Sequence, residues 1–362
     1  SLCNNTTGCK NVALGQNAMK ASTTGCFNTA LGMGSLALNE TANCNTAVGA
    51  CSMAANTTGA TNVAVGKDSM LLNTTGADNA ALGTESLRNN TTGASNLAFG
   101  YRALYSNTTA SDNTAVGKNS LLTNTTGANN SASGVNSLKL NTTGANNTAM
   151  GAYALKANTT ASENTAVGFY SLCSNTTGTR NSALGYRTMC SNTTGGANVA
   201  LGNNALFTNS TGDNNIGIGR DALFANTTAD SNVAVGFCSL AANTTGAANT
   251  AVGTSSLDSN TTGYANVAIG CDAMQTNTEG FSNTAVGHNS LELNTTGDQN
   301  VAIGDAALRS NTTASCNTAV GFSAAKCTTT ADNNTAMGFC ALFANTTASQ
   351  NTAIGTNALR DN

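Results

Sequence analysis

Few residues of this chain could carry out chemistry, and their spacing does not resemble a catalytic centre. His288 is the single histidine among 362 residues, which excludes most acid–base relays, catalytic triads and histidine-based zinc sites. It stands beside Asn289 and is interpreted as an ordinary surface side chain. Asp and Glu are scattered, without the regular acidic positions of calcium-binding solenoids. The sequence therefore predicts no enzyme, no metal site and no cofactor.

Twelve cysteines are the other reactive side chains, and no C-x-x-C motif occurs among them. They are Cys3, Cys9, Cys26, Cys44, Cys51, Cys173, Cys190, Cys238, Cys271, Cys316, Cys327 and Cys340. In two pairs, Cys9 with Cys26 and Cys173 with Cys190, the members are 17 residues apart. The whole sequence has this same period, so the spacing of the pairs follows from a repeat.

The repeat is a phrase of the form Asn-x-Ala-apolar-Gly, which recurs every 17 residues in 21 copies without insertion or deletion. We number each copy from the Asn of the Asn-Thr-Thr phrase, so that the first full copy is 5–21 and the last is 345–361. The remaining residues, 1–4 and Asn362, continue the pattern. The sequence thus predicts a single repeat array over 1–362 that is cut within a repeat at both ends.

The composition excludes several classes of protein. Charged residues are 9% and aromatic residues 4% of the chain, and Pro and Trp are absent, unlike an ordinary globular domain or a typical disordered chain. The formal net charge of −3 provides no basic face for nucleic acid. No run of 18 apolar residues is present, so no membrane span is predicted.

The repeat positions differ in what they accept. Charged residues occur only at positions 2, 3, 5, 6, 12, 13, 16 and 17, so the other positions are predicted to be buried or geometrically fixed. Position 9 is Ala in all copies except at Gly217, and position 15 is Leu or Met except at Ala325. Positions 10 and 15 are expected to supply the large core side chains. Position 9 is expected to pack against backbone, either across the coil or against another chain.

One short extended segment per 17 residues, followed by an invariant Gly, predicts an all-β parallel β-solenoid with one coil per repeat and 21 full coils. The invariant Gly of position 11 predicts a corner with positive φ or a close backbone approach. It is represented by Gly15, Gly32, Gly49, Gly117 and Gly168. In such a solenoid, residues at the same repeat position of neighbouring coils lie about 4.8 Å apart in a column. Cys9 and Cys26 share one column, and Cys173 and Cys190 share another, so each pair is a candidate disulfide.

Asparagine forms two regular columns. Position 7 is always Asn, as at Asn11, Asn28, Asn45, Asn113 and Asn164, and is predicted to be structural, forming an Asx turn into the strand. Position 1 begins an Asn-x-Ser/Thr glycosylation motif in 18 of 21 copies, which is also explained by an Asn ladder at a corner. The candidate glycosylation sites are Asn56, Asn73, Asn107, Asn124, Asn141, Asn175, Asn243 and Asn294.

Position 4 is Gly in 14 copies and Ala in seven, and in those seven the next residue is Asn, Ser or Asp. These polar residues are expected to hydrogen-bond the backbone of their own turn. The substitution then indicates two interchangeable turn variants.

The phrase Asn-Thr-Ala-Val-Gly, as in 45–49, 113–117, 164–168 and 249–253, resembles the head repeats of trimeric autotransporter adhesins and shaft repeats of phage and virus tail fibres. The resemblance implies three chains side by side, with the position-9 alanine face between them. The Asn-Thr-Thr turn and the cysteines depart from that family.

These observations lead to the hypothesis of a non-enzymatic structural fibre or adhesin-like shaft outside the cell or on a virion. Its partners are expected to be other copies of itself, as a homotrimer or an end-to-end filament. A host surface or glycan would be bound through a tip domain that the sequence does not include. Two alternatives stay open, an ice-binding or other surface-binding rod with Thr columns, and a subunit of a sheath or extracellular filament.

Overall fold

The computed structural model describes residues 2–361 and divides the chain into two compact units, Ser1–Arg180 and Asn181–Asn362. In each unit every 17-residue repeat forms one coil of a parallel β-solenoid, with a three-residue strand at repeat positions 8–10. The predicted fold class is confirmed. The described residues contain no helix, and accordingly none that is long and apolar enough to traverse a bilayer.

Unit 1 contains β1 (Val12–Leu14), β2 (Thr29–Leu31), β3 (Thr46–Val48), β4 (Val63–Val65), β5 (Ala80–Leu82), β6 (Leu97–Phe99), β7 (Thr114–Val116), β8 (Ser131–Ser133), β9 (Thr148–Met150) and β10 (Thr165–Val167). Unit 2 contains β11 (Ser182–Leu184), β12 (Val199–Leu201), β13 (Ile216–Ile218), β14 (Val233–Val235), β15 (Thr250–Val252), β16 (Val267–Ile269), β17 (Thr284–Val286), β18 (Val301–Ile303), β19 (Thr318–Val320), β20 (Thr335–Met337) and β21 (Thr352–Ile354).

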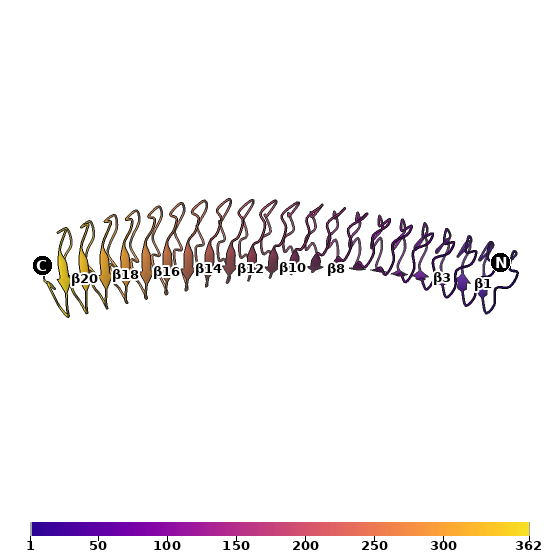
Figure 1. Ribbon diagram of the computed structural model, residues 1–362, viewed down its shortest axis with the longest axis horizontal. Helices are drawn as coiled ribbons and strands as arrows, with labels where there is room; N and C mark the ends of the chain where they lie inside the picture. The colour runs from indigo at the N-terminus through magenta and orange to yellow at the C-terminus, as the bar shows by residue number, and fades with distance from the viewer. Residues whose placement is uncertain (1, 362) are drawn as a thin grey trace. The chain divides into compact units, whose positions relative to one another are not determined.

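Neighbouring strands of a unit are parallel and in register, shifted by one whole repeat. Thr46 of β3 pairs with Val63 of β4, and Ala47 pairs with Ala64. The backbone amide of Val63 donates to the carbonyl of Asn79 in the next coil at 2.8 Å. Within each unit the strands of successive coils lie side by side (Figure 1). Residues of one repeat position therefore form a column, with a spacing of about 4.8 Å.

Leu or Met at position 15 and Ala at position 9 fill the interior of the coils. Met70, Leu87 and Ala64 are examples of side chains that are fully buried. At Gly217, the exceptional position 9, an added Cβ would lie 3.3 Å from Cγ of Leu206 and 3.3 Å from the carbonyl oxygen of Ala222. The space at position 9 thus holds one methyl group between a leucine and the backbone.

The orientation of the strand contradicts two expectations from the sequence, one about position 10 and one about position 9. Position 10 faces outward, as shown by Leu82 and Phe99, which are 43% and 52% exposed. Position 10 therefore does not share the core with position 15, and that prediction is wrong. The alanines of position 9 pack across the coil, as one of the two alternatives predicted. The expectation that they lie between chains is wrong, because they are enclosed within their own chain.

The corner after each strand explains why position 11 is always Gly. Gly117 has a φ of 126°, and an added Cβ would lie 2.7 Å from the carbonyl oxygen of Gly134 in the next coil. Both reasons given by the sequence, positive φ and a close backbone approach, apply at once. Gly15, Gly32, Gly49 and Gly168 have φ values of 134°, 138°, 132° and 131°.

Three further positions of each coil have a left-handed backbone although they are seldom Gly. In the coil of β5 these are Asp78, Glu85 and Leu87, with φ of 59°, 57° and 48°. A left-handed conformation costs about 1–2 kcal/mol per residue. All three amides donate to carbonyls of adjacent coils, at 3.1, 2.9 and 2.9 Å. The bonds between coils offset the conformational cost, and the three bends close a coil of only 17 residues.

Candidate functional sites

The asparagines of position 1 form a buried ladder. Nδ2 of Asn73 donates to Oδ1 of Asn56 at 2.8 Å and to the carbonyl oxygen of Gly76 at 2.9 Å. All eight candidate glycosylation sites have side chains with no exposed surface. These are Asn56, Asn73, Asn107, Asn124, Asn141, Asn175, Asn243 and Asn294. A glycan on Nδ2 would break these bonds and has no space, so the structure supports the ladder and argues against glycosylation.

The asparagines of position 7 form a second ladder, which is joined to the first. Oδ1 of Asn45 accepts the amide of Asn62 in the next coil at 2.9 Å, and its Nδ2 donates to the carbonyl oxygen of Gly59 at 2.9 Å. The same carbonyl accepts Nδ2 of Asn56. The predicted structural role holds, but these bonds join neighbouring coils, unlike the expected Asx turn. Asn28, Asn113 and Asn164 are similarly buried, and Asn11 of the first coil is half-buried.

The seven Ala variants of position 4 also depend on the neighbouring coil. In each of them the polar side chain of position 5 accepts the backbone amide of position 5 in the preceding coil, at 2.7–3.0 Å. The acceptors are Asn43, Ser111, Ser162, Asp230, Ser315, Asp332 and Ser349. The expectation that these side chains bond their own turn is wrong. They connect coils.

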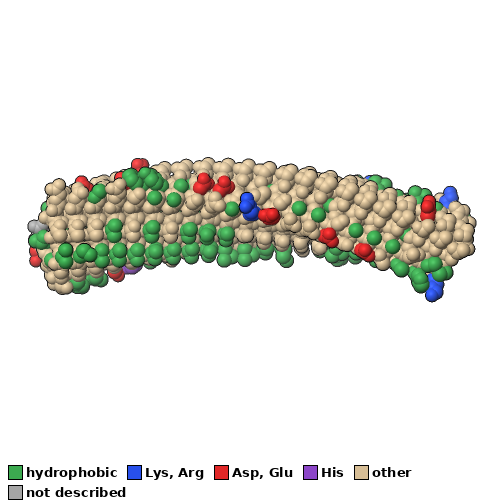
Figure 2. All heavy atoms as spheres, in the orientation of Figure 1, with side chains coloured by type: hydrophobic (Ala, Val, Ile, Leu, Met, Phe, Trp, Pro, Cys, Tyr) green, Lys and Arg blue, Asp and Glu red, His purple; other side chains and the backbone are tan. Residues whose placement is uncertain are grey.

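The outward strand face is the main apolar surface of each unit. We define it as the side chains of positions 8, 10 and 12, where no charged residue occurs at 8 or 10. Among its exposed members are Leu97, Tyr101, Ile269, Ile303 and Phe322. Hydrophobic side chains form a row along the strands of unit 2 in Figure 2. Contiguous exposed apolar surface on a soluble protein is typical of an interaction site.

Threonine forms one exposed column. Position 3 is Thr in every repeat except at Glu279, and all of these residues are exposed. The Thr of position 2 is different, because its hydroxyl donates to the position-2 carbonyl of the next coil, as from Thr74 to Thr91 at 3.0 Å. Only the position-3 column therefore exposes regularly spaced threonines to solvent at this corner.

The cysteine pair of the first coils is adjacent, as the repeat predicts. Sγ of Cys9 lies 2.9 Å from Sγ of Cys26, and the amide of Cys9 donates to Sγ of Cys26 at 3.1 Å. These two bonds hold the pKa of Cys26 below its ordinary value, whereas the bond to Cys26 raises the pKa of Cys9. The structure contains no disulfide here. Cys173 and Cys190 belong to different units, and their pairing stays a prediction.

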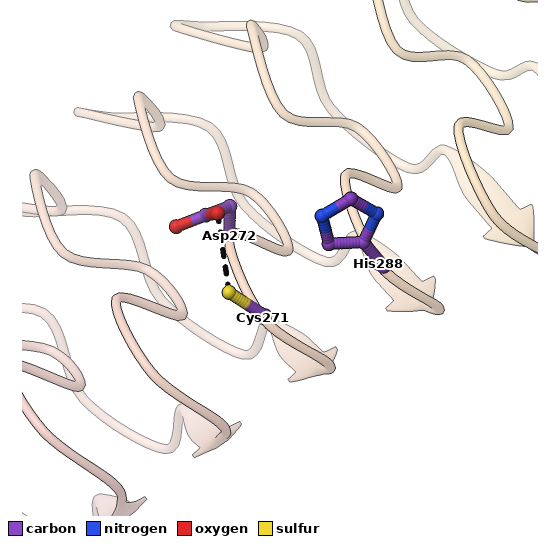
Figure 3. A group of neighbouring side chains, drawn as sticks. All are labelled: Cys271, Asp272 and His288. Atoms are coloured by element: carbon purple, nitrogen blue, oxygen red, sulfur yellow. Dashed lines mark hydrogen bonds between the residues drawn. The ribbon is translucent and has the colours of Figure 1, made fainter.

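His288 is not the isolated surface residue that the sequence suggests. One ligand atom each from Cys271, Asp272 and His288 lie within 4.8 Å of one another. Cys271 and Asp272 project side by side from the segment just after β16, and the imidazole of His288 is on the next coil (Figure 3). The thiol of Cys271 donates to Oδ2 of Asp272 at 3.1 Å, which raises the pKa of the thiol. Nδ1 of His288 lies 3.5 Å from Oδ2 of Asp305.

The signal for this cluster is present in the sequence. Cys271, His288 and Asp305 are each separated by 17 residues, so all three occupy position 12 of successive coils. A motif confined to one short segment does not contain these ligands, because they are 17 residues apart in the sequence and become neighbours only when the coils stack. Within residues 2–361 this is the one group of three or more such ligands.

Comparison with models of known protein families gives no match, and no curated protein is similar to the chain.

Proposed function

We propose that this chain is a non-enzymatic structural fibre or adhesin-like shaft, located outside a cell or on a virion. Its partners are other copies of the chain, and contact with a host surface or glycan belongs to a separate tip. The observation that carries the proposal is the outward strand face, which has no charged residue at positions 8 and 10 and presents an apolar side chain at position 10 in every repeat except at Ser133.

The repeating bonds support a mechanical role. Backbone, Asn and Thr groups of each coil are hydrogen-bonded to the coils beside them, and these contacts recur with the same geometry in both units. Such an array extends by adding identical coils, since each coil contacts only its neighbours. Length and resistance to unfolding thus follow from repetition, without a reactive site.

The strand face is the surface by which copies associate side by side, in a homotrimer as the resemblance implies. Exposed Leu, Ile and Phe side chains lose contact with water when two such faces meet, at about 25 cal/mol per Å² of apolar surface. The enclosed alanines of position 9 take no part in this contact. An end-to-end filament, as in a sheath, is the alternative form of self-association.

Solution mass tests the proposal. Light scattering of the purified chain should give a multiple of the monomer mass of 35.9 kDa. The double variant Ile269→Lys/Ile303→Lys places charges on the strand face and should yield folded monomers. Thr262→Lys/Thr296→Lys adds the same charges at position 3 of the same coils and should leave the mass unchanged. A wild-type chain that is monomeric at all concentrations would contradict side-by-side assembly.

Ice binding is a second candidate, favoured by the exposed Thr column of position 3. Two observations weaken it. The threonines of position 2 have their hydroxyls bonded to backbone, and the strand face is uneven, with Phe99, Val116 and Ser133 in consecutive coils. Inhibition of ice recrystallisation by the wild-type chain that is lost in Thr262→Lys/Thr296→Lys would establish this function instead.

A further inference from the structure

We propose that Cys271, Asp272 and His288 bind a divalent transition metal ion, zinc foremost, and that Asp305 orients the imidazole. The site lies within unit 2, just after strands β16 and β17, with Cys271 and His288 at position 12 and Asp272 at position 13 of their repeats. It is independent of the proposed fibre function, because it needs neither self-association nor a tip.

The ligand set matches the preferences of zinc. A thiolate, an imidazole and a carboxylate are the three kinds of side chain that zinc takes in proteins, at about 2.0–2.3 Å from the metal. Tetrahedral geometry then requires ligand atoms about 3.3–3.8 Å apart. The ligand atoms here lie within 4.8 Å of one another. A contraction on the order of 1 Å is sufficient, and side-chain rotation supplies it because Cys271 and His288 are exposed.

The solenoid assembles the site across coils. Cys271 and Asp272 are adjacent in one coil, and His288 follows in the next at the same repeat position as Cys271. The inter-coil bonds fix this juxtaposition: the amide of Asn289 donates to the carbonyl of Cys271 at 3.1 Å. The backbone therefore holds the ligands in place before any metal arrives.

Asp305 completes the arrangement from a third coil. Its Oδ2 lies 3.5 Å from Nδ1 of His288. The coil of His288 lies between the coil of Cys271 and that of Asp305. A carboxylate that accepts Nδ1–H leaves Nε2 as the metal ligand and fixes the ring, which is the usual support of a zinc-bound histidine. Coordination of Cys271 as a thiolate releases its proton to solvent. With three protein ligands, water fills the fourth position.

The test is a titration of the reduced full chain with zinc chloride, followed by calorimetry, in a Cys9→Ser/Cys26→Ser/Cys173→Ser/Cys190→Ser background that removes the two other candidate thiol pairs. We expect one zinc ion per chain. Cys271→Ser and His288→Ala should each weaken binding by more than tenfold, and Asp305→Asn by about tenfold. Cobalt(II) should show a thiolate charge-transfer band that is absent in Cys271→Ser.

Cys316→Ser serves as the matched control, because Cys316 is an exposed thiol of unit 2 that contacts Gln299. This variant should bind zinc like the background chain. Circular dichroism and thermal melts verify that each variant is folded. The proposal is overturned by the absence of stoichiometric zinc binding, or by binding that Cys271→Ser and His288→Ala leave unchanged.

Discussion

The side chain of each position-1 asparagine hydrogen-bonds to the asparagine of the neighbouring coil, so its replacement leaves polar groups without hydrogen-bond partners in two coils. At position 1 of the repeat 328–344, Thr328 replaces Asn, and its buried hydroxyl has no hydrogen-bond partner. Oδ1 of Asn311 in the preceding coil is also left without a partner. Ser22 interrupts the ladder in the same way, with a buried and unpartnered hydroxyl. A buried polar group without a partner costs about 1–3 kcal/mol.

Thr328→Asn should therefore stabilise the protein. The new Nδ2 would donate to Asn311 and to the carbonyl of Ala331, as in the intact copies, and we expect a gain of about 1–2 kcal/mol in the free energy of unfolding. Urea titration measures it. Thr330→Asn, two residues later at the exposed position 3, is the control and should have little effect. A variant no more stable than the wild type would contradict the energetic role of the ladder.

Cys26 should be the more reactive thiol of its pair. Hydrogen bonds from the thiol and the amide of Cys9 lower its pKa, so its thiolate forms at a lower pH than an ordinary cysteine thiolate. Alkylation with iodoacetamide across a pH series, with peptide mapping, should modify Cys26 before Cys9. Cys9→Ala removes the thiol donor and should move the alkylation profile of Cys26 to higher pH.

The same adjacency makes Cys9 and Cys26 the pair that closes under mild oxidation. Non-reducing mass mapping of the oxidised chain should recover a peptide that joins them. Equal alkylation rates for both thiols, together with no such peptide, would refute the assigned roles.

At the scale of the strand, the absence of charge did not reveal which face is buried. Positions 8, 9 and 10 all exclude charged residues, yet only position 9 points into the coil. The size of the residues was the better signal, because position 9 accepts only Ala or Gly whereas position 10 ranges from Ser133 to Phe99. A side chain enclosed by backbone is limited in volume, and one that faces outward is not.

Ala115→Leu in β7 should destabilise unit 1. Ala115 is fully buried, and the structure around position 9 accommodates one methyl group, so overpacking should cost about 1–3 kcal/mol. Thermal unfolding measures the loss. Val116→Leu in the same strand is the matched control, because position 10 faces outward and is Leu in other repeats. Equal effects of the two substitutions would contradict the assigned orientation of the strand.

The left-handed positions were not foreseen at this scale either. Position 13 is occupied by Tyr153, Glu85 and Gly34 in different repeats, so residue type gives almost no indication of its positive φ. The bonds between coils impose the conformation, and such bonds do not appear in the sequence of one repeat. Local propensity is overridden here by stacking.

At the scale of the molecule, the period and the pattern within each repeat were sufficient to predict the fold. Twenty-one uninterrupted repeats of 17 residues, with one short uncharged segment before an invariant Gly in each, are compatible with few architectures, and the solenoid is confirmed. The candidate sites were less predictable. Cys9 and Cys26 were found because their residue types match, whereas Cys271, His288 and Asp305 differ in type and were recognised only once the coils were stacked.

Removal of one whole repeat should preserve the fold. Deletion of residues 260–276 joins position 17 to position 1, so every column of unit 2 continues, and we expect a cooperative urea transition at slightly lower stability. Deletion of 260–268 removes nine residues and sets unlike positions over one another. That variant should lose its β signal in circular dichroism beyond the junction. Similar unfolding curves for the two deletions would show that register is not essential.

The asparagine ladders also determine how the protein ages. Spontaneous deamidation begins when the backbone nitrogen after an asparagine attacks the side-chain carbonyl carbon and closes a five-membered imide. After Asn73 and Asn79 these nitrogens, in Thr74 and Ala80, donate to carbonyls of the next coil at 2.9 and 2.8 Å. The side-chain amides are held on both sides by the ladders. Because stacking engages both the attacking nitrogen and the side-chain amide, deamidation should be slower in the folded protein than in the unfolded chain.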